Sequence, residues 1–242
     1  MKGHSKLEYA AGLIPFFVSL LAYCVYCQPH VSRHSASVYA ATFKCLPIVC
    51  LIAFVASVSD ERPAQERRSS NKKYLILGLL FSCAGDACLV FKDSLFLCGM
   101  AMFAIALACY VNVFGFWISN AKLSMVHLIP PAVTFLCLYG SLSLLLMVAC
   151  TVYTTVFFIL GVSACHRLFY NPSLVNLAGY IGCWSFAISD FILAVDKWKM
   201  KIDSVTIFVM ALYYVGQLLI AISFAGNCRR QVSDPSRQKR SN

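Results

Sequence analysis

Charged residues are scarce in this sequence. Of its 242 residues only 12% are Asp, Glu, Lys or Arg, whereas 60% are hydrophobic, and the mean hydropathy is +0.74. A soluble globular domain carries about 25% charged residues. The composition therefore excludes a soluble domain and indicates an integral membrane protein.

Several catalytic motifs are missing as well. The chain contains neither Gly-x-Ser-x-Gly nor His-Glu-x-x-His, which argues against a serine hydrolase and a zinc protease. Its five histidines lie in polar segments or near the ends of apolar runs, where no three of them can form a metal site. Most of the 13 cysteines lie inside apolar runs and predict packing rather than disulfides. We expect no metal and no cofactor.

The net charge of +10 could suggest nucleic-acid binding. The basic residues, however, cluster at the ends of apolar runs, where lysine and arginine set the orientation of membrane spans. We therefore expect membrane lipids as partners and no nucleic acid; the sequence gives no indication of the oligomeric state.

Eight apolar runs are present, and a helix needs about 20 residues to cross the hydrocarbon core. The fold class predicted is an all-α polytopic membrane helix bundle with eight transmembrane helices. Gly140 is the residue expected to separate the fifth run from the sixth, and Pro130-Pro131 should bend or shorten the start of the fifth. The runs are 9–27, 37–58, 74–91, 95–118, 125–139, 142–165, 174–196 and 202–225.

The distribution of lysine and arginine predicts the orientation. Eight spans place both termini on one side, and fourteen of the twenty basic residues then lie on that side. Cytosolic loops carry the excess of positive charge, so both termini should be cytosolic. We expect residues 1–226 to form the transmembrane domain and 227–242 a basic cytosolic tail. A multispan protein without a large external domain suits the endoplasmic reticulum.

Two acids and one base lie inside predicted spans. A charged side chain at the centre of a span costs roughly 2.5–3.5 kcal/mol on insertion scales and usually faces the bundle interior. Asp86 and Asp190 lie ~18 Å and ~24 Å along outward spans, and Lys44 lies ~10 Å below the outer face. The three are therefore predicted to share one pocket in the exoplasmic half. An ion pair that only fixes helix register is the alternative.

Further polar side chains are predicted at a comparable depth. Gln217 lies one helical turn from both Tyr213 and Tyr214, and the fourth run adds Tyr110 and Asn112. Tyrosines such as Tyr213 and Tyr214 more often serve packing, and the glutamine could equally join two helices.

Taken in order, these residues and their neighbours resemble the lysoplasmalogenase family, the YhhN-like eight-span membrane proteins. The resemblance extends from about residue 43 to 223. The matching pieces are Lys44-Cys45-Leu46-Pro47, Gly85-Asp86-Ala87-Cys88-Leu89, Gly99-Met100, Met102-Phe103-Ala104, Tyr110, Phe114-Gly115, Ser189-Asp190, Leu193-Ala194, Met210, Tyr213-Tyr214 and Gln217-Leu218-Leu219-Ile220.

The resemblance implies hydrolysis of the vinyl (alkenyl) ether bond of lysoplasmalogens to a fatty aldehyde and glycerophosphocholine or glycerophosphoethanolamine. We expect Asp86 and Asp190 to form the catalytic acid and base pair, with the division of the two roles between them open. Animal relatives commonly carry a histidine where this chain has Leu107, which bears on activity or substrate preference. The residues expected to bind substrate are Lys44, Tyr110, Asp196, Tyr213, Tyr214 and Gln217.

The chemistry suits two carboxyl groups. Cleavage begins with protonation of the β-carbon of the vinyl ether, and carbon is a poor proton acceptor, so a strong general acid is needed. A carboxyl group in a low-dielectric pocket holds its proton near neutral pH. A second, ionised carboxylate stabilises the oxocarbenium ion or activates water, as in glycosidases. Asp196, nearer the surface, is the candidate contact for a choline or ethanolamine cation, or else a solvated helix end.

Two other functions remain open. Asp86 and Asp190 each begin an Asp-x-x-Leu sequence, 104 residues apart, as a duplicated four-helix unit would produce. Such a repeat, with intramembrane aspartates and a lysine, also fits a proton-coupled transporter. Leu107 is the feature that suggests a catalytically silent lipid-binding relative.

Overall fold

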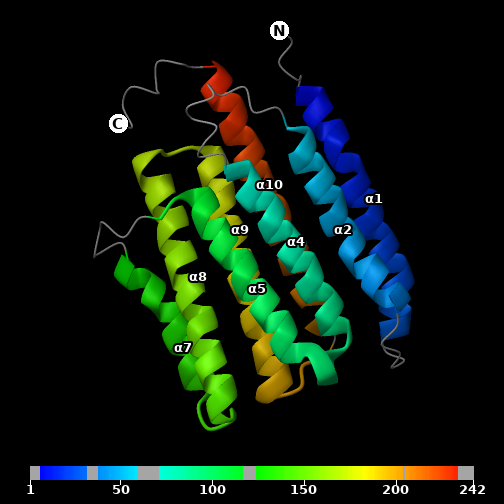
Figure 1. The fold of residues 1–242 in the computed structure, drawn as a ribbon, viewed down its shortest axis with the longest axis vertical. Coiled ribbons are helices and arrows are strands. Elements are labelled where there is room, and N and C mark those ends of the chain that lie inside the picture. The colour runs from blue at the N-terminus through cyan, green and yellow to red at the C-terminus, as the bar shows by residue number, and fades with distance from the viewer. Residues whose placement is uncertain (1–5, 32–37, 59–70, 117–123, 204, 234–242) are drawn as a thin grey trace. The chain divides into compact units, whose positions relative to one another are not determined.

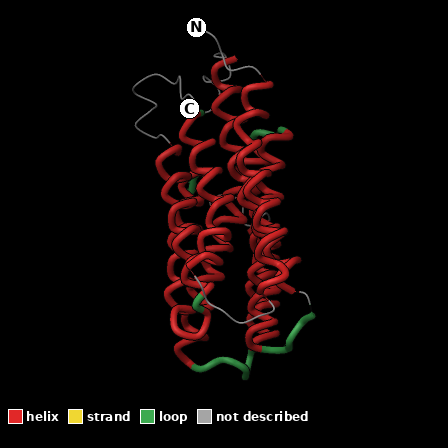
Figure 2. The backbone as a smooth tube through the Cα atoms, turned by 90° about the vertical axis from the view of Figure 1, so that its right-hand side faces the viewer, coloured by secondary structure: helices red, strands yellow, loops and turns green. Residues whose placement is uncertain are grey.

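The computed structural model describes residues 6–31, 38–58, 71–116, 124–203 and 205–233. These residues form helices and short loops with no strand among them (Figures 1 and 2), which confirms the all-α fold class. The helices are α1 (Lys6–Val31), α2 (Val38–Ser57), α4 (Asn71–Val90), α5 (Lys92–Phe114), the 3₁₀ helix η1 (Val126–Leu128), α7 (Ile129–Leu138), α8 (Leu144–Tyr170), α9 (Leu174–Trp198) and α10 (Val205–Ser233).

Six helices in the described part of the chain are long and apolar enough to cross a membrane, which makes this an integral multi-pass membrane protein. The first and fifth predicted runs correspond to shorter apolar segments, Tyr9–Val25 and Val126–Leu138. The count of eight spans and the cytosolic termini therefore stay predictions. The six spanning segments are Val38–Ser57, Asn71–Val90, Leu95–Phe114, Leu144–Tyr170, Leu174–Trp198 and Val205–Cys228.

Both features predicted for the fifth run are confirmed. The chain enters it through the 3₁₀ turn η1, and Pro130 and Pro131 lie in the first turn of α7, where a missing backbone N–H costs no helical hydrogen bond. Gly140 has φ +76° and ends the run before α8, a conformation that suits glycine. The result is a helix of 10 residues, about 15 Å long.

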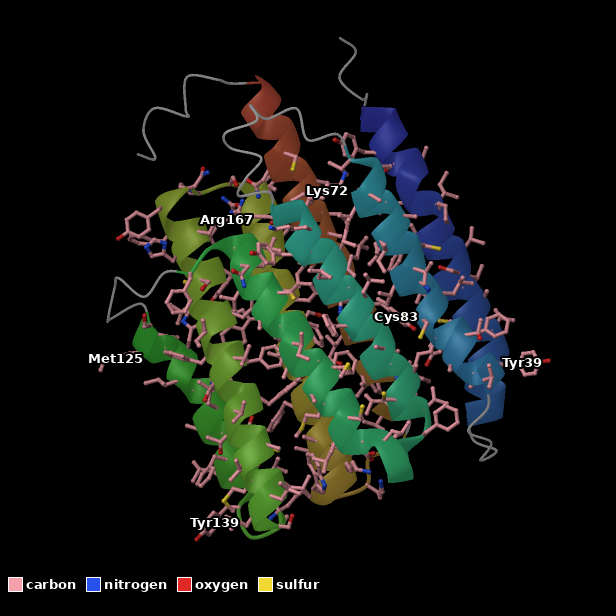
Figure 3. The ribbon with its side chains drawn as sticks, viewed as in Figure 1. Tyr39, Lys72, Cys83, Met125, Tyr139 and Arg167 are labelled. Atoms are coloured by element: carbon pink, nitrogen blue, oxygen red, sulfur yellow. The ribbon has the colours of Figure 1, made fainter. Side chains whose placement is uncertain are left out.

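The helices fall into two compact units. The first comprises residues 1–58 and 76–106, with α1, α2, most of α4 and the first part of α5. Helices α1 and α2 lie side by side (Figure 1), and Phe54 of α2 packs between Tyr9 and Gly12 of α1. Tyr39, at the start of α2, is 78% exposed and points away from the ribbon (Figure 3).

Glycines bring α4 and α5 together within the first unit. A Cβ on Gly85 would lie 2.7 Å from the ring of Phe103, and one on Gly99 would lie 3.3 Å from the carbonyl oxygen of Gly85. In a membrane, helices associate through close packing rather than through the hydrophobic effect, so small residues gather where helices cross. The crossing is next to Asp86, the predicted catalytic residue.

The second unit comprises residues 59–75 and 107–242, and α9 and α10 form its closest pair. A Cβ on Gly182 would lie 2.9 Å from the carbonyl oxygen of Gly216, and the reverse distance is the same. Further along α9, the hydroxyls of Ser185 and Ser189 donate to backbone carbonyls of α10 at 2.8 and 2.9 Å. Small residues and serine hydroxyls therefore fix the register of these two helices.

The end of α5 is also held within the second unit. Arg167 of α8 and Asn71 of α4 both donate to the carbonyl oxygen of Val113, at 2.8 and 2.7 Å. Figure 3 shows Arg167 near the end of α8. The last carbonyls of a helix lack intrahelical donors, so these side chains supply a missing bond. They fix the turn of α5 that follows Tyr110.

The predicted basic tail is described only in part. Helix α10 continues through residues 227–233, and residues 234–242 lie outside the described chain. The division between a transmembrane domain and a tail at residue 227 stays a prediction.

Candidate active site

Lys44 of α2 and Asp86 of α4 form an ion pair, with the lysine Nζ 3.1 Å from the aspartate Oδ1. Beside it, the thiol of Cys45 donates to the carbonyl oxygen of Cys83, a residue of α4 labelled in Figure 3, at 3.3 Å. Two adjacent residues of α2 therefore contact one turn of α4. This confirms that the intramembrane lysine and the first intramembrane aspartate come together.

The environment of this pair decides its electrostatics. The Asp86 side chain is 2% exposed and that of Lys44 is 14% exposed. A carboxylate that has lost its water needs a compensating charge, and an ammonium group within 4 Å supplies it. The contact fits two roles for Asp86: a structural ion pair between α2 and α4, or a catalytic carboxylate that Lys44 keeps ionised.

Asp190 of α9 has a different partner, the phenol of Tyr153. The Tyr153 hydroxyl donates to the Oδ2 of Asp190 from the middle of α8. The neighbouring hydroxyl of Ser189 donates to the carbonyl oxygen of Val209, which fixes this turn of α9 against α10. Asp190 is only half-buried, unlike Asp86.

Tyr153 is the functional candidate that the sequence interpretation missed. It lies in the sixth predicted span, among apolar and threonine residues, and no other member of the predicted site belongs to that span. Its hydroxyl could have identified it from the sequence, because a phenol inside a membrane requires a hydrogen-bond partner.

Tyr110 and Gln217, which were predicted to lie at a comparable depth, contact each other in the second unit. The Tyr110 hydroxyl donates to the Oε1 of Gln217 at 2.6 Å, and both side chains are 0% exposed. Leu107, one turn before Tyr110 on α5, is likewise fully buried. The position at which this chain departs from the expected histidine therefore lies inside the protein and not on its lipid-facing surface.

The two adjacent tyrosines of α10 are both buried, at 3% exposure for Tyr213 and 1% for Tyr214. The ring of Tyr213 lies 5.2 Å from that of Tyr214 and 5.3 Å from that of Phe186 on α9. Tyr213 thus has the packing role that the sequence left open, next to Gln217 on the same helix. Their contacts with substrate stay predictions.

The carboxylate of Asp196 has two partners in the loop between α9 and α10. Its Oδ1 accepts from the backbone N–H of Ile202 at 3.0 Å, and its Oδ2 lies 3.5 Å from the Nζ of Lys201. These contacts support a structural role at the helix end. Binding of a choline or ethanolamine cation by Asp196 stays a prediction.

The polar residues therefore form three contacts, one in the first unit and two in the second. Lys44 and Asp86 meet in the first, while Asp190 meets Tyr153 and Tyr110 meets Gln217 in the second. The single pocket predicted for Lys44, Asp86 and Asp190 stays a prediction. Among the described residues, no three His, Cys, Asp or Glu side chains are grouped so that they could hold a metal ion.

Comparison with known proteins gives a consistent set of relatives. A sequence model described as the YhhN family matches residues 39–224. The lysoplasmalogenase TMEM86A of Bos taurus is 30% identical over 230 residues, which cover 92% of this chain and 91% of that protein. The lysoplasmalogenase TMEM86B of Homo sapiens is 30% identical over 212 residues, covering 87% of this chain and 85% of that protein. No solved structure matches the chain.

Proposed function

The chain belongs to the YhhN family, and from this premise we propose that it hydrolyses the vinyl ether bond of lysoplasmalogens within the membrane. The products are a fatty aldehyde and glycerophosphocholine or glycerophosphoethanolamine. Relatives named lysoplasmalogenase align with about nine-tenths of the chain. The observation that carries the proposal is that two intramembrane carboxyl groups have different partners, a charged ammonium group for Asp86 and a neutral phenol for Asp190.

The partner of Asp86 assigns its role. A cation 3.1 Å away favours the ionised carboxylate. An ionised carboxylate cannot donate a proton, but it stabilises a developing oxocarbenium ion and takes a proton from water. We therefore assign Asp86 as the base and Lys44 as the residue that keeps it charged.

We assign the complementary role, that of the general acid, to Asp190 in its neutral form. A neutral carboxylic acid has one oxygen that accepts a hydrogen bond and one that donates. With Oδ2 accepting from Tyr153, the proton is carried on Oδ1. In the proposal, Asp190 then serves as the general acid for the β-carbon of the vinyl ether.

The proposed steps balance. Asp190 gives its proton to the β-carbon, and the double-bond electrons leave an oxocarbenium ion at the carbon bonded to oxygen. Water adds to that carbon and loses a proton to Asp86, giving a hemiacetal. The hemiacetal then collapses: its hydroxyl proton passes to Asp190, the C–O bond to glycerol breaks, and Asp86 protonates the glycerol oxygen. Both carboxyl groups return to their starting states.

The other polar residues have binding roles in the proposal. Gln217, fixed by Tyr110, and the neighbouring Tyr213 and Tyr214 orient the water or the glycerol hydroxyl. Asp196 remains the candidate for the head-group cation. The proposal also includes eight spans, cytosolic termini and residence in the endoplasmic reticulum. Limited proteolysis of tagged protein in sealed microsomes tests the number of spans and the side on which the termini lie.

The experiment uses purified full-length protein in nanodiscs, supplied with choline and ethanolamine lysoplasmalogens, with fatty aldehyde as the readout. Asp86→Asn and Asp190→Asn should each reduce aldehyde release at least about a hundredfold, since each removes a proton-transfer group. Asp203→Asn is the matched control, because Asp203 is an exposed residue of the α9–α10 loop. In D₂O, the trapped aldehyde should carry deuterium on the carbon next to its carbonyl.

Other outcomes identify the alternatives. Full activity in either variant removes that aspartate from the mechanism. Lysolipid binding without aldehyde release, with turnover gained by Leu107→His, would identify a catalytically silent relative. Uptake of a solute into liposomes driven by a pH gradient, with no lipid turnover, would identify a transporter.

A further inference from the structure

An apolar pocket lies in the second unit, between η1, α7, α8 and α9. Its space is roughly 330 Å³, part of it open to the outside. Apart from one imidazole, one thiol and one indole N–H, the side chains around it present carbon, and its rings come from three different helices. The residues that line it include His127, Phe157, Phe158, Gly161, Trp184 and Ala187.

The pocket adjoins the contact between Tyr153 and Asp190. On α8, Phe157 lies one turn after Tyr153, and the two rings are 5.4 Å apart. On α9, which runs antiparallel to α8, Ala187 lies nearly one turn before Asp190. Both helices therefore line the same apolar pocket on one side of the Asp190 carboxyl group. At ~1.5 Å per residue, the lined part of α8 ends about 10 Å from that group.

The far end of the pocket is closed by a buried imidazole. His127 is 3% exposed, and its Nε2 lies 3.3 Å from the hydroxyl of Tyr180. Its ring fits against α8 because residue 161 is glycine: a Cβ there would lie 2.8 Å from the imidazole. The ring of Trp184 lies 5.8 Å from that of His127 and forms the adjacent wall.

We infer, on the basis of the proposed function, that this pocket holds the hydrocarbon chain of the lysoplasmalogen. If Asp190 protonates the vinyl ether, the carbon chain begins at the next atom and must continue into an apolar space. The pocket is such a space, and Phe157 in its wall packs against Tyr153, the partner of Asp190. The phosphate-bearing end of the substrate then extends in the opposite direction.

Shape, rather than hydrophobicity, decides which chains this pocket accepts. A chain that moves from the bilayer into the pocket leaves one apolar medium for another, so its binding depends on packing. Residues that narrow the pocket should therefore discriminate against long chains much more than against short ones. Ala187, the small residue nearest to Asp190 along the wall, is the position at which added volume blocks the chain.

The first test compares two adjacent substitutions on α9. Ala187→Phe fills the pocket, whereas Ile188→Phe adds a ring at a position that is 45% exposed and outside the pocket. For Ala187→Phe, the ratio of kcat/KM for hexadecenyl over octenyl lysoplasmalogen should fall at least about tenfold. For Ile188→Phe the ratio should stay at the wild-type value. An unchanged ratio in Ala187→Phe overturns the inference while the hydrolase stands.

The second test does not depend on turnover. The probe is an alkyl-ether lysophospholipid with a diazirine at the end of its chain; it lacks the vinyl group and cannot be cleaved. Photolysis should label η1, α7 and the Phe158–Gly161 turn of α8, with competition by lysoplasmalogen and loss of labelling in Ala187→Phe. Labelling elsewhere overturns the inference. Labelling here, without aldehyde release from any substrate, supports the chain site and removes the hydrolase function.

Discussion

Removing one partner of the Lys44–Asp86 pair should destabilise the protein more than removing both. At 3.1 Å and an effective dielectric constant of ~20, the attraction between the two charges is about 5 kcal/mol. Lys44→Met leaves a carboxylate that is 2% exposed without this attraction, and breaking such a buried pair costs about 3–5 kcal/mol. The double variant Lys44→Met/Asp86→Asn contains neither charge and should recover part of the loss.

The two single variants should also differ from each other. Lys44 is 14% exposed and its long side chain can carry the ammonium group toward water, whereas the short Asp86 side chain has no such route. Asp86→Asn should therefore cost less stability than Lys44→Met. All three variants should lack aldehyde release, because the ionised carboxylate or its counter-charge is missing in each.

Thermal unfolding of the protein in detergent measures these differences. A loss of 3–5 kcal/mol corresponds to a fall in Tm of about 6–20 °C for a chain of this size. The double-mutant cycle should give a coupling energy of at least about 1 kcal/mol. Two results would refute the interpretation of this contact as a buried ion pair. One is that the stability losses of the two single variants add up to that of the double variant, and the other is that Lys44→Met has the wild-type Tm.

Two further predictions concern the second unit. Tyr153→Phe keeps the ring but removes the donor to Asp190, so kcat should fall about tenfold to a hundredfold and the stability should fall by about 1–3 kcal/mol; a wild-type kcat would exclude Tyr153 from the mechanism. Gly182→Ala places a methyl group 2.9 Å from the Gly216 carbonyl oxygen and should destabilise the protein by about 1–3 kcal/mol. Ile181→Ala, at a position that is 48% exposed, should keep the wild-type Tm, and equal Tm values for both would contradict the close packing of α9 on α10.

The sequence was sufficient to find the helices and the polar residues inside them. Hydropathy located each helix to within a few residues, except that α1, α8 and α10 extend further, and Gly140 marked the break before α8 because of its backbone freedom. The intramembrane lysine and aspartates were identifiable because the membrane makes isolated charges costly. These are properties of the local sequence and require no knowledge of neighbouring helices.

The partner of each polar side chain was decided by tertiary structure. Tyr153 was not expected to contact Asp190, and Asp196 binds the loop that follows it. These helices are apolar around most of their circumference, so the sequence does not show which face meets a neighbour. Close contacts between the two helices, such as that of Gly182 with Gly216, fix the rotation and register of α9 on α10. That rotation determines which oxygen atom meets which donor, and so it determines the chemistry that each carboxyl group can perform.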